Sequence, residues 1–532
     1  MRRAVLLAAT AVLLCGPTVL AFFAGGYFDG PRAVAAAVAW ALVLALALAG
    51  PLPLPKGVHG WLAVAGLAGL ALWSAISVAW APLDGPALDS VQRLLLYLGV
   101  LLAAVALLRD GRAARAVEPA LALGALVVIG YGLLGRLLPG IVELSHSDTS
   151  GGRLEQPITY WNAEGLLAAM GLVLCIRLAG DPSRADRVRA AAAAACAPLG
   201  AGVYLSYSRG ALAVTAIGLI VLLATDASWP QLRATVTGLV SGFVAAACSA
   251  ALPGVASLEG APGEQQRDGA IMLAILVLVV VAAALLTARA ARAERAGTAR
   301  LGSLPHAGRL PAVAAAATLL CVAGLVAGGL GESADRSDGA RAGPSRLASV
   351  ESLRYEYWRV GVSSFGSHPL LGEGAGGFRV IWRMERDVDE PVIQVHSLVL
   401  EKAAELGIPG LLLLGLFVGG VAAAGRRALR EGAPLAPGAC AACIVWLLHA
   451  SIDWDWQLPA VTLPAVVLAG GLLAASERPS GYLAGPVPPG PSARVKARAV
   501  SGGTGPRIGI RARMRPPSGG GWSPASSTTL RS

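Results

Sequence analysis

The feature that most constrains this chain is a series of apolar runs of about 18 to 22 residues, separated by short connections rich in Gly, Pro and Arg. A helix needs about 20 apolar residues to cross the hydrocarbon core of a bilayer, so each run has the length of a transmembrane helix. Of the 532 residues, 55% are hydrophobic and only 14% are charged, which is far too apolar for soluble domains. The pattern predicts an all-α fold, a polytopic bundle of transmembrane helices.

Fourteen apolar runs can be marked, and we expect about 12–14 of them to span, because the turn between the seventh and the eighth is very short. The first run follows Met1-Arg2-Arg3 and could be a signal peptide. Its length and the lack of a small-x-small cleavage site favour a first span. The predicted spans are 4–24, 32–50, 60–80, 91–108, 119–138, 161–179, 189–205, 208–225, 233–252, 270–288, 311–330, 398–424, 437–452 and 459–475.

Basic residues are distributed unevenly between the two sides that an alternating path defines. The side of the amino terminus carries nineteen Arg and Lys in its connections, whereas short connections on the other side carry six. Because Lys and Arg are enriched in cytoplasmic loops, this predicts a multi-pass protein of the cytoplasmic membrane with both termini in the cytoplasm. The six outer residues are Arg32, Arg93, Arg136, Arg153, Arg209 and Arg267.

One long polar segment interrupts the spans, and the same alternation places it outside the cytoplasm. Within it, Ser349 to Phe365 has apolar residues at near-helical spacing, which predicts an amphipathic helix that ends at Ser367-His368-Pro369. The carboxyl-terminal segment is rich in Pro, Gly, Ser and Arg and is expected to be a disordered basic cytoplasmic tail. The predicted division is 1–330 with eleven spans, the extracytoplasmic loop 331–397, 398–475 with three spans, and the tail 476–532.

Several classes of site are disfavoured by the residues present. The net charge of +11 does not indicate nucleic-acid binding, because the basic residues lie in connections between apolar runs. All seven cysteines fall inside apolar runs, without the spacing of a zinc site. The pairs Asp387-Val388-Asp389 and Asp453-Trp454-Asp455 could hold a divalent metal, although the tryptophans of the second also fit an aromatic belt. We expect no metal and no cofactor.

Two groups of arginines are candidate substrate-binding residues. Arg209, in Ser206-Tyr207-Ser208-Arg209-Gly210, stands at the outer end of an apolar run, where a charge is costly unless it finds a partner. The alternative is a side chain that reaches lipid headgroups. Arg354 and Arg359 lie on the predicted loop helix beside aromatic residues, and guanidinium groups bind phosphate oxygens in pairs. Their alternative is a surface helix whose arginines pair with Glu351 and Glu356.

His396 is the candidate catalytic residue, because it stands at the boundary between the polar loop and a long apolar run. An imidazole can accept a proton from an attacking hydroxyl at neutral pH, which a carboxylate does less readily. The alternative is a histidine that only caps the following helix.

Taken together, these motifs resemble the O-antigen ligase and polymerase superfamily of bacterial envelope proteins over about residues 157–475. The matching pieces are Tyr160-Trp161-Asn162-Ala163, Ser208-Arg209-Gly210, Arg354 to Trp358, the run from His368 to Gly374, His396, and the run from Ala404 to Gly410. The chain departs from the family pattern at Ser397, where Asn is common, and in its fourteen spans, which exceed the usual dozen or so.

The resemblance implies a metal-independent, inverting glycosyl transfer from an undecaprenyl-pyrophosphate-linked glycan to an acceptor hydroxyl. It implies His396 as general base and Arg209 and Arg354 as binders of the donor pyrophosphate. The expected partners are therefore a lipid-linked glycan donor, a glycan, lipid or protein acceptor, and the bilayer. Two other functions stay open, a transporter or flippase of lipid-linked glycans and a membrane scaffold without chemistry.

Overall fold

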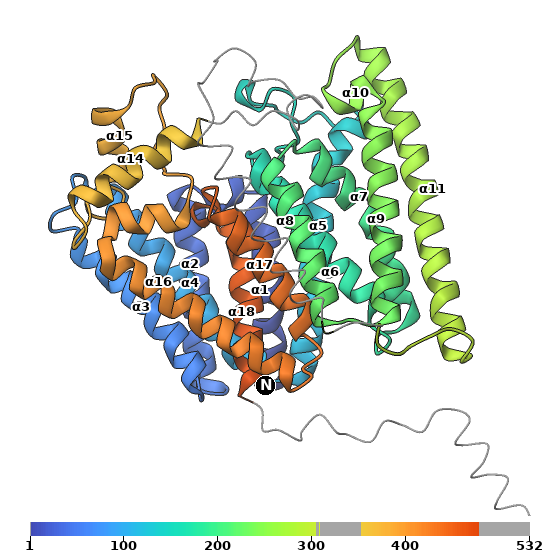
Figure 1. The fold of residues 1–532 in the computed structure, drawn as a ribbon, viewed down its shortest axis with the longest axis horizontal. Helices are drawn as coiled ribbons and strands as arrows, with labels where there is room; N and C mark the ends of the chain where they lie inside the picture. The colour runs from blue at the N-terminus through green and yellow to red at the C-terminus, as the bar shows by residue number, and fades with distance from the viewer. Residues whose placement is uncertain (1, 305–307, 309–352, 478–532) are drawn as a thin grey trace, which may run out of the picture. The chain divides into compact units, whose positions relative to one another are not determined.

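The computed structural model describes residues 2–304, 308 and 353–477. Every element named in this part of the chain is helical (Figure 1), which confirms the all-α class. Eleven helices are long and apolar enough to cross a membrane, and two more, α8 and α17, are apolar but shorter. The chain is therefore a multi-pass membrane protein built as a polytopic helical bundle.

The helices are α1 (Arg2–Ala21), α2 (Asp29–Ala49), α3 (Val58–Ser77), α4 (Asp84–Leu107), α5 (Gly111–Leu137), α6 (Trp161–Gly180), α7 (Asp186–Leu205), α8 (Arg209–Thr225), α9 (Trp229–Ala250), α10 (Pro253–Ala256), α11 (Pro262–Arg295), α14 (Arg354–Ser367), α15 (Phe378–Glu385), α16 (Leu398–Arg430), α17 (Ala436–Ala450) and α18 (Pro459–Ser476). Three 3-10 turns join them: η1 (Ala24–Gly26), η2 (Asp148–Ser150) and η4 (Asp455–Gln457).

Helices occupy the predicted spans wherever the structure describes them. The predicted span 311–330, the loop segment 331–352 and the tail beyond Glu477 lie outside the described residues. The division of the chain into membrane and loop segments stays a prediction. The loop helix begins at Arg354 within the described residues and ends at Ser367, as the His-Pro stop predicted.

Five of the six arginines that the sequence assigns to outer connections lie inside helices instead. They are Arg32 in α2, Arg93 in α4, Arg136 in the last turn of α5, Arg209 at the first position of α8 and Arg267 near the start of α11. The reason is that the predicted spans follow the apolar part of each run, whereas these helices extend into the polar turns at their ends. The side of the membrane on which these ends lie stays a prediction. Arg136 is buried and bonds the carbonyl oxygens of Val255 and Gly152, both at 2.6 Å.

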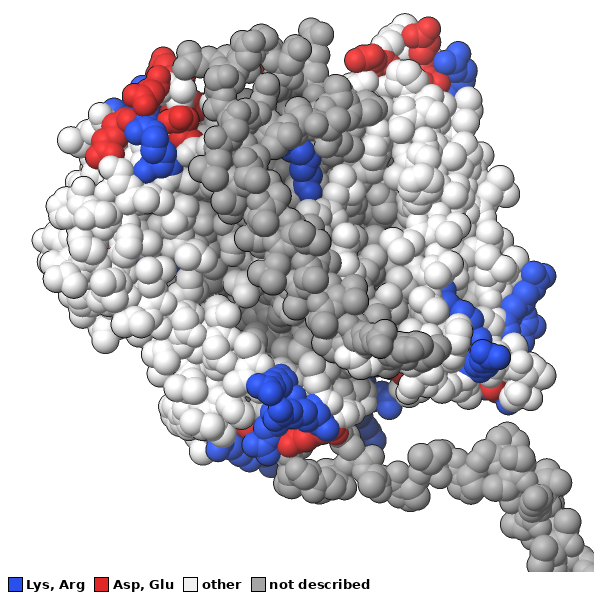
Figure 2. Space-filling model, viewed as in Figure 1, with Lys and Arg blue, Asp and Glu red and all other residues white. Residues whose placement is uncertain are grey.

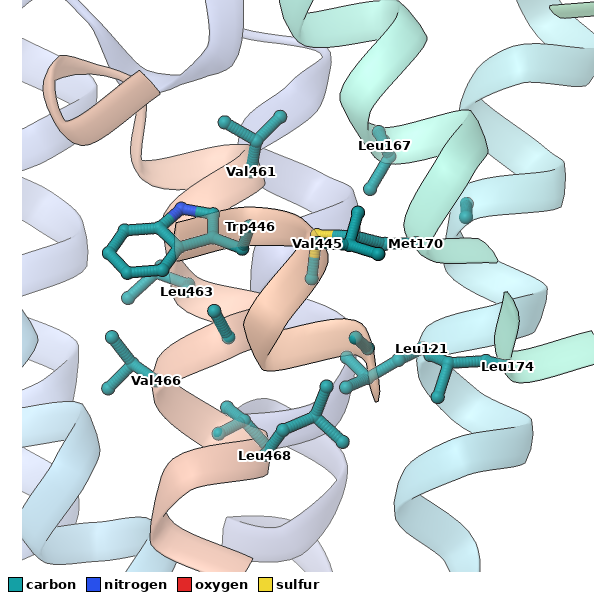
Figure 3. Close-up of a cluster of buried hydrophobic side chains, with 14 of the residues drawn as sticks. Leu121, Leu167, Met170, Leu174, Val445, Trp446, Val461, Leu463, Val466 and Leu468 are labelled. Atoms are coloured by element: carbon teal, nitrogen blue, oxygen red, sulfur yellow. The ribbon is translucent and has the colours of Figure 1, made fainter. Parts of the chain in front are cut away.

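The centre of the bundle is formed by α6, α17 and α18, whose neighbours cover them on several sides. The spanning windows of α6 and α18 are completely buried within the protein. Figure 3 shows Leu167 and Met170 of α6 beside Val445 of α17 and Val461 of α18. Because lipid tails are as apolar as these side chains, close packing rather than water exclusion holds such helices together.

Glycines allow α3 and α16 to approach closely. A Cβ atom on Gly66 of α3 would lie 2.4 Å from the backbone nitrogen of Phe417, and one on Gly420 of α16 would lie 2.7 Å from that of Ala63. Small residues at helix contacts are the usual device for close packing in membranes. This contact holds the middle of α16 against the bundle.

Charged residues gather at the ends of the helices and leave an uncharged band between them (Figure 2). At one end, Glu477 after α18 bonds Arg109 at 2.8 Å and the backbone N–H of Lys56 at 2.6 Å. The amino terminus lies at this end too (Figure 1). Helices α14 and α15 pack at the opposite end, where α16 begins (Figure 1).

Candidate functional site

The connection between α17 and α18 is the point where several of the predicted site residues meet. Asp453 on this connection is completely buried and accepts a hydrogen bond from Arg354 Nη2 at 2.5 Å. It also accepts one from the Tyr160 hydroxyl at 2.8 Å and one from the Trp454 backbone N–H at 2.8 Å. Asp453 therefore ties the loop helix α14 to the bundle.

The charge of this pair is stabilised in its buried position. Burial opposes ionisation of Asp453, but the neighbouring cations, led by Arg354, outweigh it and hold the pKa of Asp453 below its usual range. Burial likewise opposes the charge on Arg354, and the attraction of Asp453 still raises the pKa of this guanidinium. A salt bridge so placed orients Arg354 strongly, because removing either partner would leave a buried charge uncompensated.

The Tyr160-Trp161-Asn162 element extends this network from the start of α6. Asn162 Nδ2 donates to the Tyr160 hydroxyl at 2.7 Å, and the Tyr160 hydroxyl in turn donates to Asp453. The ring centroids of Tyr160 and Trp454 are 4.6 Å apart. The motif on the sixth predicted span thus contributes a positioning chain for Asp453 and, through it, for Arg354.

His396 lies next to the same connection. Its ring centroid is 6.2 Å from that of Trp454 and 5.0 Å from that of Tyr357 on α14. The backbone of His396 has φ +57°, a left-handed conformation that non-glycine residues seldom adopt. Trp358 Nε1 donates to the carbonyl oxygen of His396 at 3.2 Å and supports this conformation.

The hydrogen bonds of His396 define which ring nitrogen can take up a proton. Nδ1 lies 3.1 Å from the carbonyl oxygen of Gln394, which can only accept, so Nδ1 carries the hydrogen. Nε2 then presents its lone pair. Burial lowers the pKa of His396 to about 4, so the imidazole is neutral at physiological pH.

His396 does not cap α16, which was the structural alternative for this residue. The cap is Ser397, whose hydroxyl accepts from the backbone N–H of Leu400 at 3.4 Å. Ser and Asn are both strong helix caps, so the departure from the family pattern at position 397 preserves this local function. The imidazole is left for another role.

Arg209 begins α8 at the same end of the bundle. Ser208 caps this helix by accepting from the Ala211 N–H at 3.2 Å. A Cβ atom on Gly210 would lie 3.2 Å from His449 Nε2, so the start of α8 abuts the end of α17. His449 Nδ1 in turn lies 2.6 Å from Asp455 on the connection. Arg209 is thus carried on a helix start that packs against the α17–α18 connection.

Arg359 is not brought to this place. Its guanidinium bonds Glu356 at 2.9 Å and Asp387 at 2.6 Å, and 48% of its side chain is exposed. This is the surface arrangement that was the alternative for the loop arginines. Arg354, one and a half turns earlier, points to Asp453 instead, because residues five apart on a helix face different directions.

The two paired-carboxylate patterns are split among different partners. Asp387 bonds Arg359, and Asp389 bonds Arg386 at 2.7 Å. Asp453 bonds Arg354, whereas Asp455 bonds His449. Among the residues that the structure describes, no three His, Cys, Asp or Glu side chains form a group that could hold a metal ion.

The glycine-rich turn, residues 372–377, and the kinked start of α16 pair through their backbones. The N–H groups of Glu373 and Gly374 donate to the carbonyl oxygens of Ala404 and Glu405, both at 2.9 Å. Gly407 breaks the helical conformation of α16 with φ +63° and lies against Leu370. Two motifs more than thirty residues apart in the sequence therefore form one structural unit at the start of α16, the helix that follows His396.

Four helices start around the α17–α18 connection. Tyr160 precedes α6, Arg209 opens α8, His396 precedes α16, and the connection itself leads into α18. The amino-terminal end of a helix carries a partial positive charge, so their convergence favours anions at this place. The arrangement brings a neutral imidazole, the oriented guanidinium group of Arg354 and helix starts to one end of the bundle.

Asp453 was the residue whose role the sequence did not indicate. It was considered only as a metal ligand or as part of an aromatic belt, whereas the structure shows it as the partner of Arg354. One signal was available in the sequence: Asp453 directly follows an apolar run, four residues after His449. A carboxylate at the membrane boundary requires a cationic partner. The sequence could not tell which of the loop arginines would be that partner.

A comparison with protein families finds a match that covers part of this site. Residues 265–415 match a family model described as O-antigen ligase. The matched segment contains Arg354, the glycine-rich turn, His396 and the kinked start of α16, whereas Arg209 and Asp453 lie outside it. No match to a curated protein was found.

Proposed function

Because the chain belongs to the O-antigen ligase superfamily, whose members process glycans at membranes, we propose that it transfers a glycan to an acceptor hydroxyl from an undecaprenyl-pyrophosphate-type lipid carrier. The reaction takes place at the outer face of the cytoplasmic membrane, where His396 lies if both termini are cytoplasmic. A glycan, a lipid or a protein of the envelope supplies the acceptor hydroxyl.

The observation that carries this proposal is the state of His396. Its Nδ1–H is held by the Gln394 carbonyl, its pKa is lowered to about 4, and Nε2 is left as a proton acceptor. Arg354 is held nearby by Asp453. A scaffold or a transporter has no need of a neutral base beside an oriented guanidinium.

In the proposed step, the acceptor hydroxyl gives its proton to His396 Nε2 while its oxygen attacks the anomeric carbon of the donor sugar. The bond between that carbon and the pyrophosphate oxygen breaks, and the electron pair leaves with the lipid pyrophosphate. Attack opposite the leaving group inverts the anomeric configuration. Arg354 and Arg209 stabilise the negative charge that gathers on the departing pyrophosphate.

Arginines can perform the task that a divalent cation performs in other pyrophosphate enzymes. A guanidinium group offers parallel N–H donors that match two phosphate oxygens. The converging helix starts add partial positive charge. We therefore propose a metal-independent reaction, in which Asp453 compensates the charge of Arg354 until the donor binds.

An apolar groove offers a place for the isoprenoid chain of the donor. It has a volume of about 690 Å³ and is lined by α1, α2 and α4. The groove reaches Phe23 and Pro31, which flank Tyr27, and the ring of Tyr27 is 5.6 Å from that of Trp454. A polyprenyl chain in this groove would enter the site from the side of Trp454.

The test is a comparison of His396→Ala and His396→Gln with the control His59→Ala, which changes a histidine at the cytoplasmic end of α3. Each protein is purified in nanodiscs with a polyprenyl-pyrophosphate-linked glycan and an acceptor, and transfer is followed by mass spectrometry. We expect transfer to fall by about 100- to 10,000-fold in both His396 variants, while donor binding persists. His59→Ala should transfer normally.

Retention of transfer in both His396 variants would contradict the proposal. In a deletion strain, loss of glycan attachment would identify ligation, and loss of glycan chain length would identify polymerisation. Lipid-linked glycans that accumulate on the cytoplasmic face would instead support a flippase.

A further inference from the structure

A polar cavity lies beside the segment that leads into His396, and no step of the proposed transfer uses it. Its volume is about 140 Å³. Its walls come from the start of α2, the outer half of α4, the glycine-rich turn, α15, α16 and η4. The side chains that matter most are Tyr27, Arg32, Arg93, Arg379, Gln394 and Gln457.

The first acidic pair of the cavity already has a hydrogen-bond donor in Arg32. Asp29 and Asp89 both accept hydrogen bonds from Arg32 Nη2, at 2.6 Å and 2.8 Å. The other nitrogens of Arg32 bond the Tyr27 carbonyl and Gln92, each at 2.7 Å. Arg32 and its two carboxylates therefore form a complete structural cluster, and none of the three requires a ligand.

The second acidic pair is engaged as well. Glu401 accepts from Lys402 Nζ and from Gln457 Nε2, both at 2.6 Å. Glu405 accepts from backbone N–H groups of the glycine-rich turn, at Gly376. Each carboxylate that lines the cavity thus has its own donors.

Two arginines in the cavity wall, Arg93 and Arg379, differ from these groups because each has a buried nitrogen without an acceptor among the described residues. Arg93 is 6% exposed, and its Nε has no hydrogen-bond partner among the described residues. The Nε of Arg379 is also buried without a partner in the described part of the chain. A buried N–H donor without an acceptor is costly, and an arginine in a membrane helix, as Arg93 is in α4, is a functional candidate. An oxyanion in the cavity would supply the missing acceptors.

The cavity is connected to the catalytic base through Gln394 and Trp454. Gln394 lines the cavity, and its backbone carbonyl oxygen accepts the hydrogen bond from His396 Nδ1. Gln394 Nε2 also donates to the Tyr27 hydroxyl at 3.4 Å. The Tyr27 ring contacts Trp454, which contacts His396. A molecule whose anionic group is bound in the cavity can therefore extend its neighbouring groups toward the imidazole of His396.

We propose that this cavity binds a phosphate or carboxylate group of the acceptor, with Arg93 and Arg379 as its ligands. The inference rests on the proposed transfer, in which Arg354 and Arg209 hold the donor pyrophosphate. Anchoring the acceptor by its anion places its hydroxyl at His396, so the cavity selects acidic acceptors over neutral ones.

The test uses Arg93→Gln and Arg379→Gln in the full-length protein, with Arg383→Gln as the control, since Arg383 is an exposed arginine on α15. Three matched acceptor glycosides are compared: one neutral, one with a phosphate and one with a carboxylate. The kinetic constants are measured for the donor and for each acceptor, together with the thermal midpoint.

We expect wild type to prefer an acidic glycoside, and the better of the two identifies phosphate or carboxylate as the natural group. Both cavity variants should raise KM for that acceptor by about 10- to 100-fold, because a hydrogen bond to a charged group is lost. KM for the donor and for the neutral acceptor should change by less than about twofold. The thermal midpoints separate this effect from a loss of folded protein, which would lower the rate with every acceptor equally.

Equal losses on neutral and acidic acceptors, or a selective rise in donor KM, would overturn the inference. If wild type transfers no glycan to any acceptor, the proposed function fails instead. Calorimetric binding of the three glycosides then tests the cavity alone: acidic-selective binding that the two variants abolish supports it, and binding that they leave unchanged overturns it.

Discussion

At the scale of single residues, burial decides what each titratable group can do. Burial lowers the pKa of His396, and burial would also oppose the positive charge of Arg354 if Asp453 were not beside it. The sequence places His396 and Arg354 near a membrane boundary. Only the fold brings Asp453 to Arg354 and Trp454 to His396. Two predictions follow from these environments.

The first concerns the pH dependence of transfer. Because burial lowers the pKa of His396 to about 4, the base form persists below the usual range, and kcat/KM should fall only as pH drops through about 4 to 5. The unfolded chain binds the proton more readily, so acidification below about 6.5 should also destabilise the fold. His396→Gln should lack this part of the pH-dependent stability. An acid limb near pH 6.5 would contradict the assignment.

The second compares the two arginines of α14. Arg354→Lys keeps a positive charge beside Asp453 but loses the parallel donors, so transfer should fall by about 10- to 100-fold with the fold retained. Arg359→Ala breaks only exposed ion pairs, which are worth at most about 1 kcal/mol, and transfer should change by less than about threefold. Transfer assays and thermal melts on both variants measure this difference. Equal losses of transfer in the two variants would contradict this assignment and indicate that Arg359 also binds substrate.

At the scale of elements, the site depends on how α16 begins. A continuous helix could not place its first turn under the glycine-rich turn, and Gly407 provides the break, with φ +63° and ψ −158°. This backbone region is essentially restricted to glycine. The apolar groove beside α1 and α2 is a second element-scale feature, because it forms only where the two helices meet α4.

Gly407→Ala should therefore destabilise the protein by about 2 kcal/mol or more, because a Cβ atom there would also lie 2.7 Å from the Leu370 carbonyl oxygen. The matched control is Gly415→Ala on the same helix, where a Cβ atom meets no atom within 4 Å. The control should be neutral or slightly stabilising. Thermal unfolding in detergent measures both, and similar midpoints for the two variants would refute the argument.

Filling the groove should affect only long-chain donors. Val38→Trp places a large ring among the lining residues, whereas the control Leu44→Trp changes an exposed position of α2 outside the lining. KM for a donor with a long isoprenoid chain should rise about tenfold or more in Val38→Trp, and KM for a short-chain donor should change little. An equal effect of both variants on both donors would remove the groove from the proposal.

At the scale of the whole molecule, charge sets the orientation that the function requires. The end of the bundle that carries Glu477 has many arginines, whereas the opposite end carries His396. The positive-inside rule then predicts that His396 lies outside the cytoplasm. Glycan acceptors of the envelope are accessible only on that side.

Cysteine labelling checks this orientation. Asp387→Cys and Arg427→Cys introduce thiols at exposed positions on opposite ends of the bundle. In a background without the native cysteines, a membrane-impermeant maleimide should label Asp387→Cys in intact cells. Arg427→Cys should react only after permeabilisation. The reverse pattern would place His396 in the cytoplasm and end the proposed reaction.

Length and hydropathy alone determined the class of this protein, because a run of about 20 apolar residues has few alternatives to a membrane helix. The sequence also located the motifs around Arg209, Arg354 and His396, since charged residues next to apolar runs are costly and therefore informative. Only the tertiary structure decided that Asp453 pairs with Arg354 and that Arg93 faces a cavity. Those choices depend on which helices pack together, and hydrophobic packing within a membrane is too uniform along the chain to encode them locally.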